Sequence, residues 1–191
     1  MRVGVLALQG DFREHADVVS AIGSEPVLVR HAVQIAEIDA LIIPGGESTT
    51  IGMLADRFGL VEPLRDAIAA GMPTLGTCAG MIFLASGTTE AREQVQLGVL
   101  DVIVRRNAFG RQDMSFEGDL EVTGIPGQVH AVFIRAPWIE KLGEGVEVLA
   151  TVDEHPVMVR QGTILATSFH PEVAGETRIH EMLVGMIGAV R

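Results

Sequence analysis

The amino-acid sequence predicts an α/β fold with a mainly parallel central sheet and additional antiparallel or mixed strands in the second half. In the first half, short apolar strands alternate with amphipathic helices, and this alternation implies right-handed crossovers between parallel strands. Hydrophobic residues make up 48% of the 191-residue chain and charged residues 20%, which suits a sheet covered by helices on both faces. We see no repeat or interdomain linker, so we expect residues 1–191 to form a single domain.

Strand-and-helix units account for the first half of the chain. Apolar runs predict strands at residues 2–8, 25–31, 39–44 and 72–77. Amphipathic or apolar segments predict helices within residues 9–23, 45–59, 62–71 and 79–86. The expected helix signals are Asp11 with Glu14 as a capping box, Gly23 as a stop, Ser48 as a cap, and Pro63 in a first turn.

From about residue 98 the pattern changes to strands that follow one another without long helices. Segments 97–106, 119–124, 128–136 and 145–152 predict single strands. Segments 155–160 and 163–169 predict a hairpin joined at Gln161-Gly162. Apolar residues at helical spacing from Ile179 to Val190 predict a last helix that packs on the sheet.

Charge and cysteine content exclude several classes of function. Asp and Glu number 25 against 14 Lys and Arg, and the net charge of −11 repels phosphate backbones and anionic membranes. We therefore expect no nucleic acid and no membrane as partner. A single cysteine cannot form an internal disulfide, and the start "MRVGVLALQGDF" has no signal-peptide cleavage site, so we expect a cytoplasmic protein. Glycines and a proline interrupt the longest uncharged stretch, Ala67 to Thr89, which argues against a membrane span.

The only cysteine stands between two glycines in the segment Gly76-Thr77-Cys78-Ala79-Gly80. This G-x-nucleophile-x-G pattern, placed between a predicted strand and a predicted helix, is typical of a nucleophile elbow. The glycines allow the close backbone approach that a sharp, strained turn needs. The amino terminus of the following helix would favour a thiolate and help to hold an oxyanion. The alternative is a buried structural cysteine.

A nucleophilic cysteine needs a base, and one of the six histidines has suitable neighbours. In the segment "TSFHPEV", His170 follows a predicted strand and Glu172 stands two residues further on. An extended backbone would place both side chains on one face, about 6.6 Å apart at Cα. Glu172 would then orient the imidazole toward Cys78 and stabilise its protonated form. Taken alone, a His-Pro-Glu segment is more often a surface turn.

The other histidines do not suggest a second site. His15 and His180 fall in amphipathic helices beside charged residues, so we expect them to be solvated. His31, His130 and His155 flank strands without an acidic residue two positions later. A zinc site needs closely spaced Cys and His ligands, so we expect no metal.

The segment "IIPGGEST", residues 42–49, places two glycines at the carboxyl end of a buried strand. Open α/β sheets bind ligands at this end of their strands. The functional interpretation is that the N–H groups of Gly46 and Ala79 form an oxyanion hole, while Glu47 and Ser48 contact a substrate. The alternative is a tight turn that Ser48 caps.

Together these segments resemble the class I glutamine amidotransferases, in which Cys, His and Glu follow in this order with one residue between His and Glu. More closely, "GVLALQGDFREH", "IIPGGEST", "GTCAGMI", "RRNAFGRQ", "VFIRAPWI" and "ATSFHPE" are similar to the glutaminase subunits of pyridoxal 5′-phosphate synthase. The similarity runs over essentially the whole chain. It implies a flavodoxin-like, three-layer α/β/α sandwich.

The resemblance also implies roles for individual residues. Cys78 would be the nucleophile, His170 the acid/base and Glu172 its orienting partner. An arginine can bind a substrate carboxylate bidentately, but only the resemblance favours Arg106 over Arg105. The implied contacts to L-glutamine are Gly46, Glu47, Ser48, Arg106, Ile134 and Arg135.

The implied reaction is hydrolysis of L-glutamine to L-glutamate and ammonia through a glutamyl thioester on Cys78. The ammonia would pass to a separate synthase subunit that builds pyridoxal 5′-phosphate within a hetero-oligomeric complex. This chain itself would need no cofactor. The Gly45-Gly46 peptide can flip at low cost, which offers a switch for the oxyanion hole on docking.

Three other functions stay open at this point. A glutaminase of the same class would serve a different synthase. A cysteine hydrolase or stress protein would share the sandwich and the elbow, and a flavodoxin-like binding module would carry an incidental cysteine. The joint occurrence of elbow, His-x-Glu segment and diglycine turn favours the glutaminase.

Overall fold

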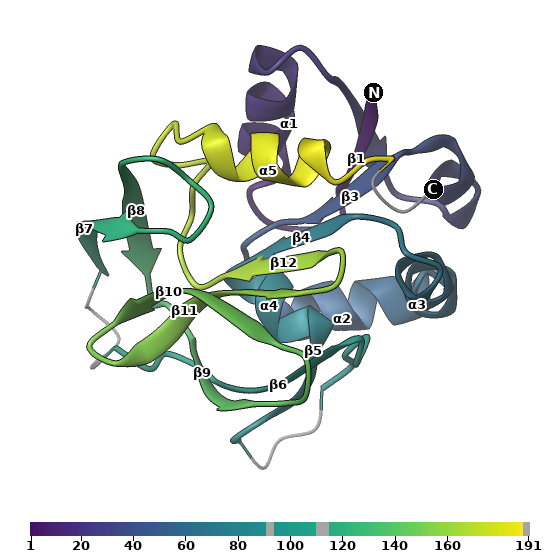
Figure 1. The fold of residues 1–191 in the computed structure, drawn as a ribbon. Helices are drawn as coiled ribbons and strands as arrows, with labels where there is room; N and C mark the ends of the chain where they lie inside the picture. Colours follow the sequence, from purple (N-terminus) through teal and green to yellow (C-terminus); the bar gives the residue numbers. More distant parts are fainter. Residues whose placement is uncertain (91–93, 110–114, 189–191) are drawn as a thin grey trace.

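A seven-stranded sheet forms the centre of the computed structural model, which describes residues 1–90, 94–109 and 115–188 (Figure 1). The strands of this sheet are β1 (Arg2–Leu6), β2 (Glu25–Val29), β3 (Ala40–Ile43), β4 (Thr74–Thr77), β10 (Glu147–Val152), β11 (His155–Gln161) and β12 (Ile164–Thr167). They lie in the order β10-β11-β12-β4-β3-β1-β2. The five strands from β12 to β2 are parallel, and β10, β11 and β12 pair antiparallel. The mainly parallel sheet predicted from the sequence is confirmed.

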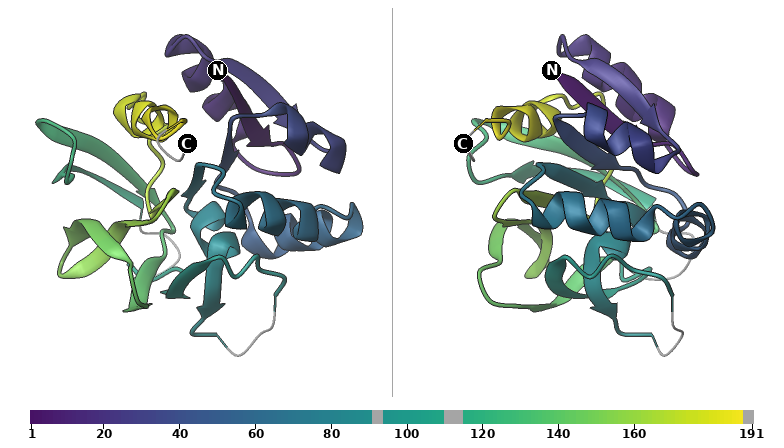
Figure 2. Two further views of the ribbon diagram at one scale, coloured as in Figure 1. Left: turned by 45° about the vertical axis from the view of Figure 1, so that its right-hand side comes forward. Right: turned by 90° about the vertical axis from the view of Figure 1, so that its right-hand side faces the viewer.

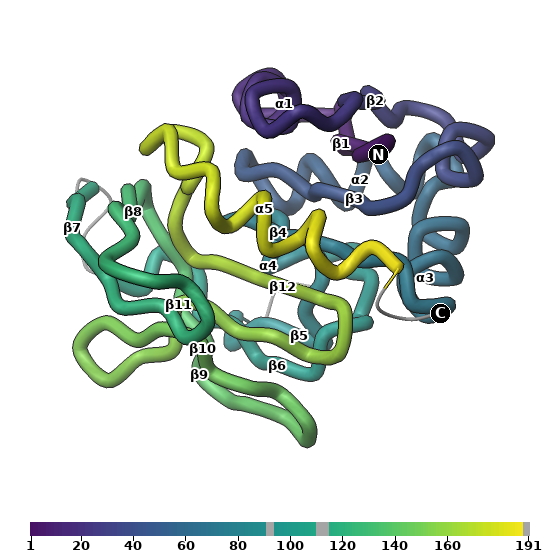
Figure 3. The backbone as a smooth tube through the Cα atoms, turned by 45° about the horizontal axis from the view of Figure 1, so that its top comes forward, coloured from purple at the N-terminus to yellow at the C-terminus, as the bar shows by residue number. Residues whose placement is uncertain are grey.

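Helices cover both faces of this sheet and complete the predicted three layers (Figures 1 and 2). One face carries α1 (Phe12–Ala21) and α5 (Arg178–Gly185), and α5 lies over β4 (Figure 3). The other face carries the 3-10 helix η1 (Ala32–Glu37), α2 (Ser48–Arg57), α3 (Val61–Ala69) and α4 (Ala79–Leu84). None of the helices in the described residues is long and apolar enough to cross a membrane.

The central strands are apolar throughout because each of their faces has its own core. Side chains alternate between the faces of a strand, so neighbouring residues enter different cores. Ile42 packs with Val19 of α1 and Leu183 of α5, whereas Ile43 packs with Leu64 of α3 and the residues of α4. Burial on both faces thus explains the continuous apolar runs in the sequence.

Two smaller sheets complete the fold. The first contains β5 (Ala85–Thr88), β6 (Leu100–Arg105) and β9 (Trp138–Leu142), and it joins the core beneath α2, α3 and α4. The second is the antiparallel pair β7 (Ser115–Glu121) and β8 (Gln128–Ile134), which packs into the core with α1 and α5. The antiparallel and mixed strands expected in the second half are therefore present.

Several elements differ from those predicted. Strand β7 spans Ser115–Glu121 where residues 119–124 were expected, and η1 and β5 were not predicted. The helix expected over residues 79–86 ends at Leu84, because its last carbonyls accept hydrogen bonds from Leu97 and Val99 and the chain continues as β5. Strand β9 was not predicted, since charged Glu140 and Lys141 obscure its apolar pattern. Helix α5 ends at Gly185, and the predicted end near residue 190 lies outside the described residues.

Candidate active site

Cys78 lies at the turn where β4 ends and α4 begins. Its N–H donates to the carbonyl of Thr167 at 2.7 Å, and its own carbonyl accepts from Ile82 N–H at 3.3 Å. The residue thus belongs to the sheet ladder on one side and to the first helical turn on the other. Its φ of +48° and ψ of −102° are unusual for a residue with a side chain. The strand-turn-helix geometry expected of a nucleophile elbow is observed.

The two glycines of the elbow have a steric reason. A Cβ atom on Gly80 would overlap the carbonyl oxygen of Ile43, which belongs to the neighbouring strand β3. A Cβ atom on Gly76 would overlap the side chain of Leu84 and the backbone of Gly80. Glycine is therefore the only residue that fits at either position without a shift of the surrounding backbone or side chains.

His170 and Glu172 are paired as expected. The Nδ1 atom of His170 lies 2.7 Å from Oε1 of Glu172, and the two residues are only 4% and 6% exposed. The backbone differs from the extended strand that we assumed, because residues 168–169 bend and 171–175 form turns. Val132 of β8 anchors this segment by accepting a 2.9 Å hydrogen bond from His170 N–H.

The surroundings of His170 favour its protonated form. Burial alone would lower the pKa of His170, but hydrogen bonds with Asp11, Cys78 and Glu172 outweigh burial and raise this pKa to about 12. Burial raises the pKa of Glu172, and its hydrogen bond with His170 acts in the opposite direction. An imidazolium beside a sulfur atom stabilises a thiolate, which is the nucleophilic form of cysteine.

Asp11 is a member of this cluster that the sequence did not reveal. We expected it to cap the first helix, and this prediction is wrong, because its side chain makes no capping hydrogen bond. Its Oδ2 atom lies instead 3.3 Å from Nδ1 of His170. Asp11, His170 and Glu172 bring potential ligand atoms within 4.8 Å of one another, but the histidine nitrogen involved is already bonded to Glu172. We interpret the cluster as the support of the imidazole.

Cys78 opens onto a pocket that contains every glutamine contact implied by the sequence resemblance. The same pocket contains Ala79, one of the two residues expected to form the oxyanion hole. Asn107 also lines it and was not anticipated. The predicted residues in the lining, besides Cys78 and Ala79, are Gly46, Glu47, Ser48, Arg106, Ile134 and Arg135.

Backbone strain concentrates around this pocket. Among the described residues other than glycine, five have a positive φ, and three of these five line the pocket. They are Cys78, Asn107 and Arg135, with φ of +48°, +46° and +46°. Such conformations cost about 1–3 kcal/mol each and cluster at functional sites.

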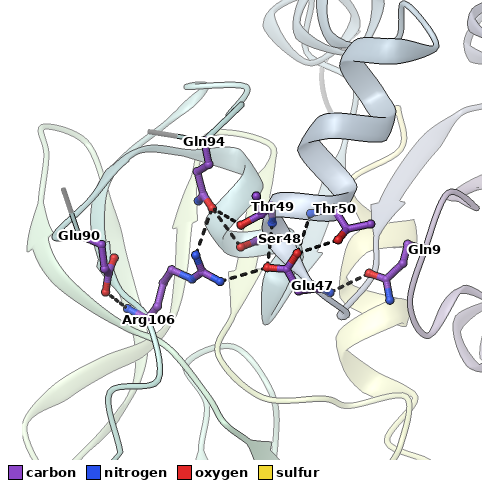
Figure 4. A network of polar contacts seen from close by, with 8 residues as sticks. All are labelled: Gln9, Glu47, Ser48, Thr49, Thr50, Glu90, Gln94 and Arg106. Atoms are coloured by element: carbon purple, nitrogen blue, oxygen red, sulfur yellow. Dashed lines mark hydrogen bonds and ion pairs between the residues drawn. The ribbon is translucent and has the colours of Figure 1, made fainter. Parts of the chain in front are cut away.

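The side chains of Arg105 and Arg106 lie in different surroundings. Arg105 forms a two-pronged ion pair with Glu140 at 3.0 Å and lies over the ring of Trp138. Arg106 lines the pocket and approaches Oε1 of Glu47 to 3.1 Å (Figure 4). Of these two neighbouring arginines, Arg106 is the one that lines the pocket beside Cys78.

Glu47 caps helix α2, and the expectation that Ser48 would do so is wrong. The Glu47 carboxylate accepts hydrogen bonds from the N–H groups of Thr49 at 3.1 Å and Thr50 at 2.7 Å (Figure 4). Because the helix begins at Ser48, that residue is already inside its first turn, and its hydroxyl donates to Gln94 at 3.3 Å. The side chain of Gln9 accepts from Glu47 N–H at 2.7 Å.

Glu47→Ala is expected to destabilise the protein by about 1 kcal/mol at neutral pH, the usual cost of losing an N-cap. Burial opposes ionisation of Glu47, but hydrogen bonds from Thr50 and Thr49 prevail and lower its pKa to about 2. The unfolded chain therefore binds this proton first on acidification, so the difference between wild type and variant should shrink as the pH falls from about 4.5 to 2. Urea unfolding across this range measures it. Glu14→Ala, in the first turn of α1, is the control, and an equal loss at every pH would contradict the assignment.

The expectation that His15 and His180 are solvated is wrong. Both side chains are 0% exposed, and Nδ1 of His15 lies 2.9 Å from Nε2 of His180. Their helices turn these positions toward the sheet, which a single helix pattern does not reveal. His130 likewise has acidic partners, Asp119 and Glu117, but across the β7-β8 pair and not along its own strand.

Known proteins match the chain over nearly its full length. The model of the SNO glutamine amidotransferase family matches residues 5–189. The pyridoxal 5′-phosphate synthase subunit PdxT of Frankia casuarinae is 60% identical over 188 residues, which cover 97% of this chain and 94% of the relative. The PdxT subunit of Mycobacteroides abscessus is 55% identical over 188 residues, which cover 98% of this chain and 97% of the relative.

Solved structures agree with these relatives. A crystal structure of a glutamine amidotransferase matches with a TM-score of 0.93 and 52% identity, and the match covers 97% of this chain and 98% of that one. PurLQS from Thermotoga maritima matches with a TM-score of 0.74 at 16% identity and covers 96% and 97%, which shows a shared fold only. The resemblance identified from the sequence motifs is confirmed: the chain belongs to the SNO glutamine amidotransferase family.

Proposed function

We propose that this chain is the glutaminase subunit of a pyridoxal 5′-phosphate synthase. As a glutamine amidotransferase it releases ammonia from L-glutamine, and the names of relatives with 55% and 60% identity support pyridoxal 5′-phosphate as the product that receives the nitrogen. The observation that carries the proposal is the pocket itself. It joins a cysteine on a strained turn to the residues that the family resemblance assigns to glutamine.

The first half of the reaction forms a thioester. The Cys78 thiolate attacks the side-chain amide carbon of glutamine, and the N–H groups of Gly46 and Ala79 stabilise the oxyanion. When the intermediate collapses, the carbon–nitrogen bond breaks and His170 donates a proton to the departing amine. Ammonia leaves, and the γ-glutamyl group stays on the sulfur.

The second half releases glutamate. His170, now neutral, accepts a proton from water, and the resulting hydroxide attacks the thioester carbon. The carbon–sulfur bond breaks, and thiolate and imidazolium are restored. Throughout the cycle Glu172 and Asp11 hold Nδ1 of His170, so Nε2 is the nitrogen left to face the sulfur and the leaving group.

The charged residues that line the pocket complement the two charged groups of an amino acid. Arg106 and Arg135 supply positive charge for the α-carboxylate, and Glu47 supplies negative charge for the α-ammonium group. The lowered pKa of Glu47, about 2, keeps its carboxylate ionised at neutral pH. The 3.1 Å contact between Arg106 and Glu47 keeps these opposite charges side by side.

The Gly45-Gly46 peptide supports a docking-dependent switch. Gly45 accepts a hydrogen bond from Asp11 N–H at 3.2 Å, and Gly46 adopts a φ of +148° that favours glycine. A flip of this peptide breaks that one bond, at a cost of about 1 kcal/mol. Binding of the synthase subunit next to this turn would therefore be enough to reset the oxyanion hole.

Ammonia release from L-glutamine, measured with and without a pyridoxal 5′-phosphate synthase subunit, tests this function. We expect release to rise when the synthase subunit is added and to vanish in Cys78→Ala. Equal turnover by the isolated chain and the complex would refute the switch. No release in either condition would point to a different synthase partner or to a different amide substrate. We place the reaction in the cytoplasm, because the single cysteine is free and a reducing compartment keeps such a thiol active.

A further inference from the structure

Two buried histidines lie behind the catalytic cluster, and the reaction described above uses neither. His15 comes from α1 and His180 from α5, 165 residues apart in the chain. Their rings are 5.1 Å apart and joined by the 2.9 Å contact between Nδ1 of His15 and Nε2 of His180. Burying two imidazoles costs free energy unless their nitrogens are paired, so their role in the core needs an explanation.

The other nitrogen of His15 faces the active site. Its Nε2 atom lies 3.1 Å from Oγ1 of Thr77, the residue before Cys78, and 3.5 Å from Oε2 of Glu172. Oε2 of Glu172 is fully buried and has no hydrogen-bond partner among the described residues, so the Nε2 atom of His15 at 3.5 Å is a polar contact rather than a formed hydrogen bond. The opposite oxygen of the same carboxylate holds His170. Glu172 therefore stands between two histidines, with one facing each oxygen.

The protonation states follow from burial. Burial, then the proximity of His180 and His170, lowers the pKa of His15 well below its usual value. Burial lowers the pKa of His180 to about 4, against a weaker opposing effect of Glu176. Both rings are thus neutral at pH 7, and each has one N–H donor and one acceptor nitrogen.

The carboxylate determines which nitrogen carries each hydrogen. When Glu172 is ionised its carboxylate can only accept, so the Nε2 atom of His15 then carries the hydrogen and shares it between Oγ1 of Thr77 at 3.1 Å and Oε2 of Glu172 at 3.5 Å. The Nδ1 atom of His15 is then the acceptor, and Nε2 of His180 donates to it. Hydrogen bonds thus run in one direction, from His180 through His15 toward Glu172.

We propose that His15 is a positioning residue for glutamine hydrolysis. Its Nε2–H, directed at Oε2 of Glu172, keeps Oε1 aimed at Nδ1 of His170. It acts only through Glu172 and touches neither substrate nor Cys78. The contact with Thr77 ties this arrangement to the end of β4, so the elbow and the carboxylate share one support. The inference rests on the proposed roles of His170 and Glu172 in the reaction.

Replacing His15 with glutamine or with asparagine distinguishes a positioning role from simple packing in the core. The amide nitrogen of glutamine reaches about as far as Nε2 of histidine, whereas that of asparagine reaches only as far as Nδ1. His15→Gln keeps a donor toward Glu172, and His15→Asn keeps only the contact with His180. Both variants are measured as the chain assembled with the synthase subunit, by ammonia release over a range of glutamine concentrations.

We expect His15→Asn to lower kcat about 10-fold or more. Activity falls by about this factor when a residue that orients a functional side chain is lost. KM for glutamine should stay within about twofold, because the substrate pocket is untouched. His15→Gln should recover most of the lost kcat. A structural role alone predicts parallel losses of thermal stability without this difference in kcat. His130→Asn, on the exposed face of β8, is the control and should match wild type.

Equal kcat values for the asparagine and glutamine variants would overturn the proposal, whether both are active or both impaired. Glu172→Gln, measured beside them, separates this failure from failure of the proposed mechanism. If Glu172→Gln is strongly impaired while the two His15 variants are equal, only the role of His15 falls. If Glu172→Gln retains wild-type kcat, both the role of Glu172 and the inference built on it fall.

Discussion

Cys78→Ala is expected to reduce ammonia release from glutamine by about 10⁴-fold or more, the scale on which removal of a nucleophile acts. Without the sulfur no thioester forms, and the remaining oxyanion donors and binding groups only polarise the amide. The fold should persist, because alanine keeps the Cβ and removes a single atom from a residue that already tolerates a φ of +48°. The measurement is single-turnover and steady-state ammonia release, accompanied by thermal unfolding.

The chain offers a direct control for this result. Cys78 is its only cysteine, so alkylation with iodoacetamide modifies one sulfur and mass spectrometry counts it without ambiguity. Alkylated wild type should lose activity to the same extent as Cys78→Ala, and glutamine should slow the alkylation by occupying the pocket. Retention of turnover by Cys78→Ala would show that another group attacks the amide and would remove the basis of the proposed mechanism.

Gly80→Ala is expected to destabilise the protein by about 3 kcal/mol, near the upper range for overpacking in a core. For a chain of this size that corresponds to a fall in Tm of roughly 6–12 °C. The direction of this change is informative, because replacing glycine with alanine inside a helix normally stabilises a protein by about 1 kcal/mol. Here the new Cβ would overlap the Ile43 carbonyl oxygen, and β3 and the elbow would have to separate.

Gly185→Ala is the matched control for this substitution. Gly185 also lies in a helix, but a Cβ atom there meets nothing within 4 Å, so alanine should be neutral or stabilising by up to about 1 kcal/mol. Urea unfolding of both variants gives the two free energies, and ammonia release shows whether the elbow has moved. A Gly80→Ala protein as stable as Gly185→Ala would mean that the turn relaxes freely and that the glycine has no steric role.

Much of the candidate site could be predicted from the sequence because its parts are local. The elbow depends on residues two positions from Cys78, and the pairing of His170 with Glu172 spans two residues. Contacts over such short separations depend mainly on backbone geometry and residue type. The pairing survived even though the assumed extended backbone proved to be a turn.

The incorrect predictions have a common physical cause. Asp11 and Ser48 were taken as caps because both residue types cap helices, yet each has a partner in a loop distant in sequence, His170 and Gln94 respectively. His15 and His180 were expected in solvent because their neighbours in sequence are charged. A helix pattern shows that one face is polar but not which other helix or strand will cover it.

By itself the sequence determined the α/β class, the elbow, and the candidate residues for catalysis and for glutamine binding, since these rest on local spacing and on family motifs. Only the tertiary structure decided that Asp11 turns to His170, that Glu47 caps α2, and that His15 meets Glu172. The contacts of Asp11 and His15 join segments far apart in the chain, which the packing of α1 against the sheet brings together. The cap by Glu47 is local, but where α2 begins decides which residue makes it. Burial then sets their protonation states, because an imidazole removed from water favours its neutral form unless a carboxylate or thiolate lies beside it.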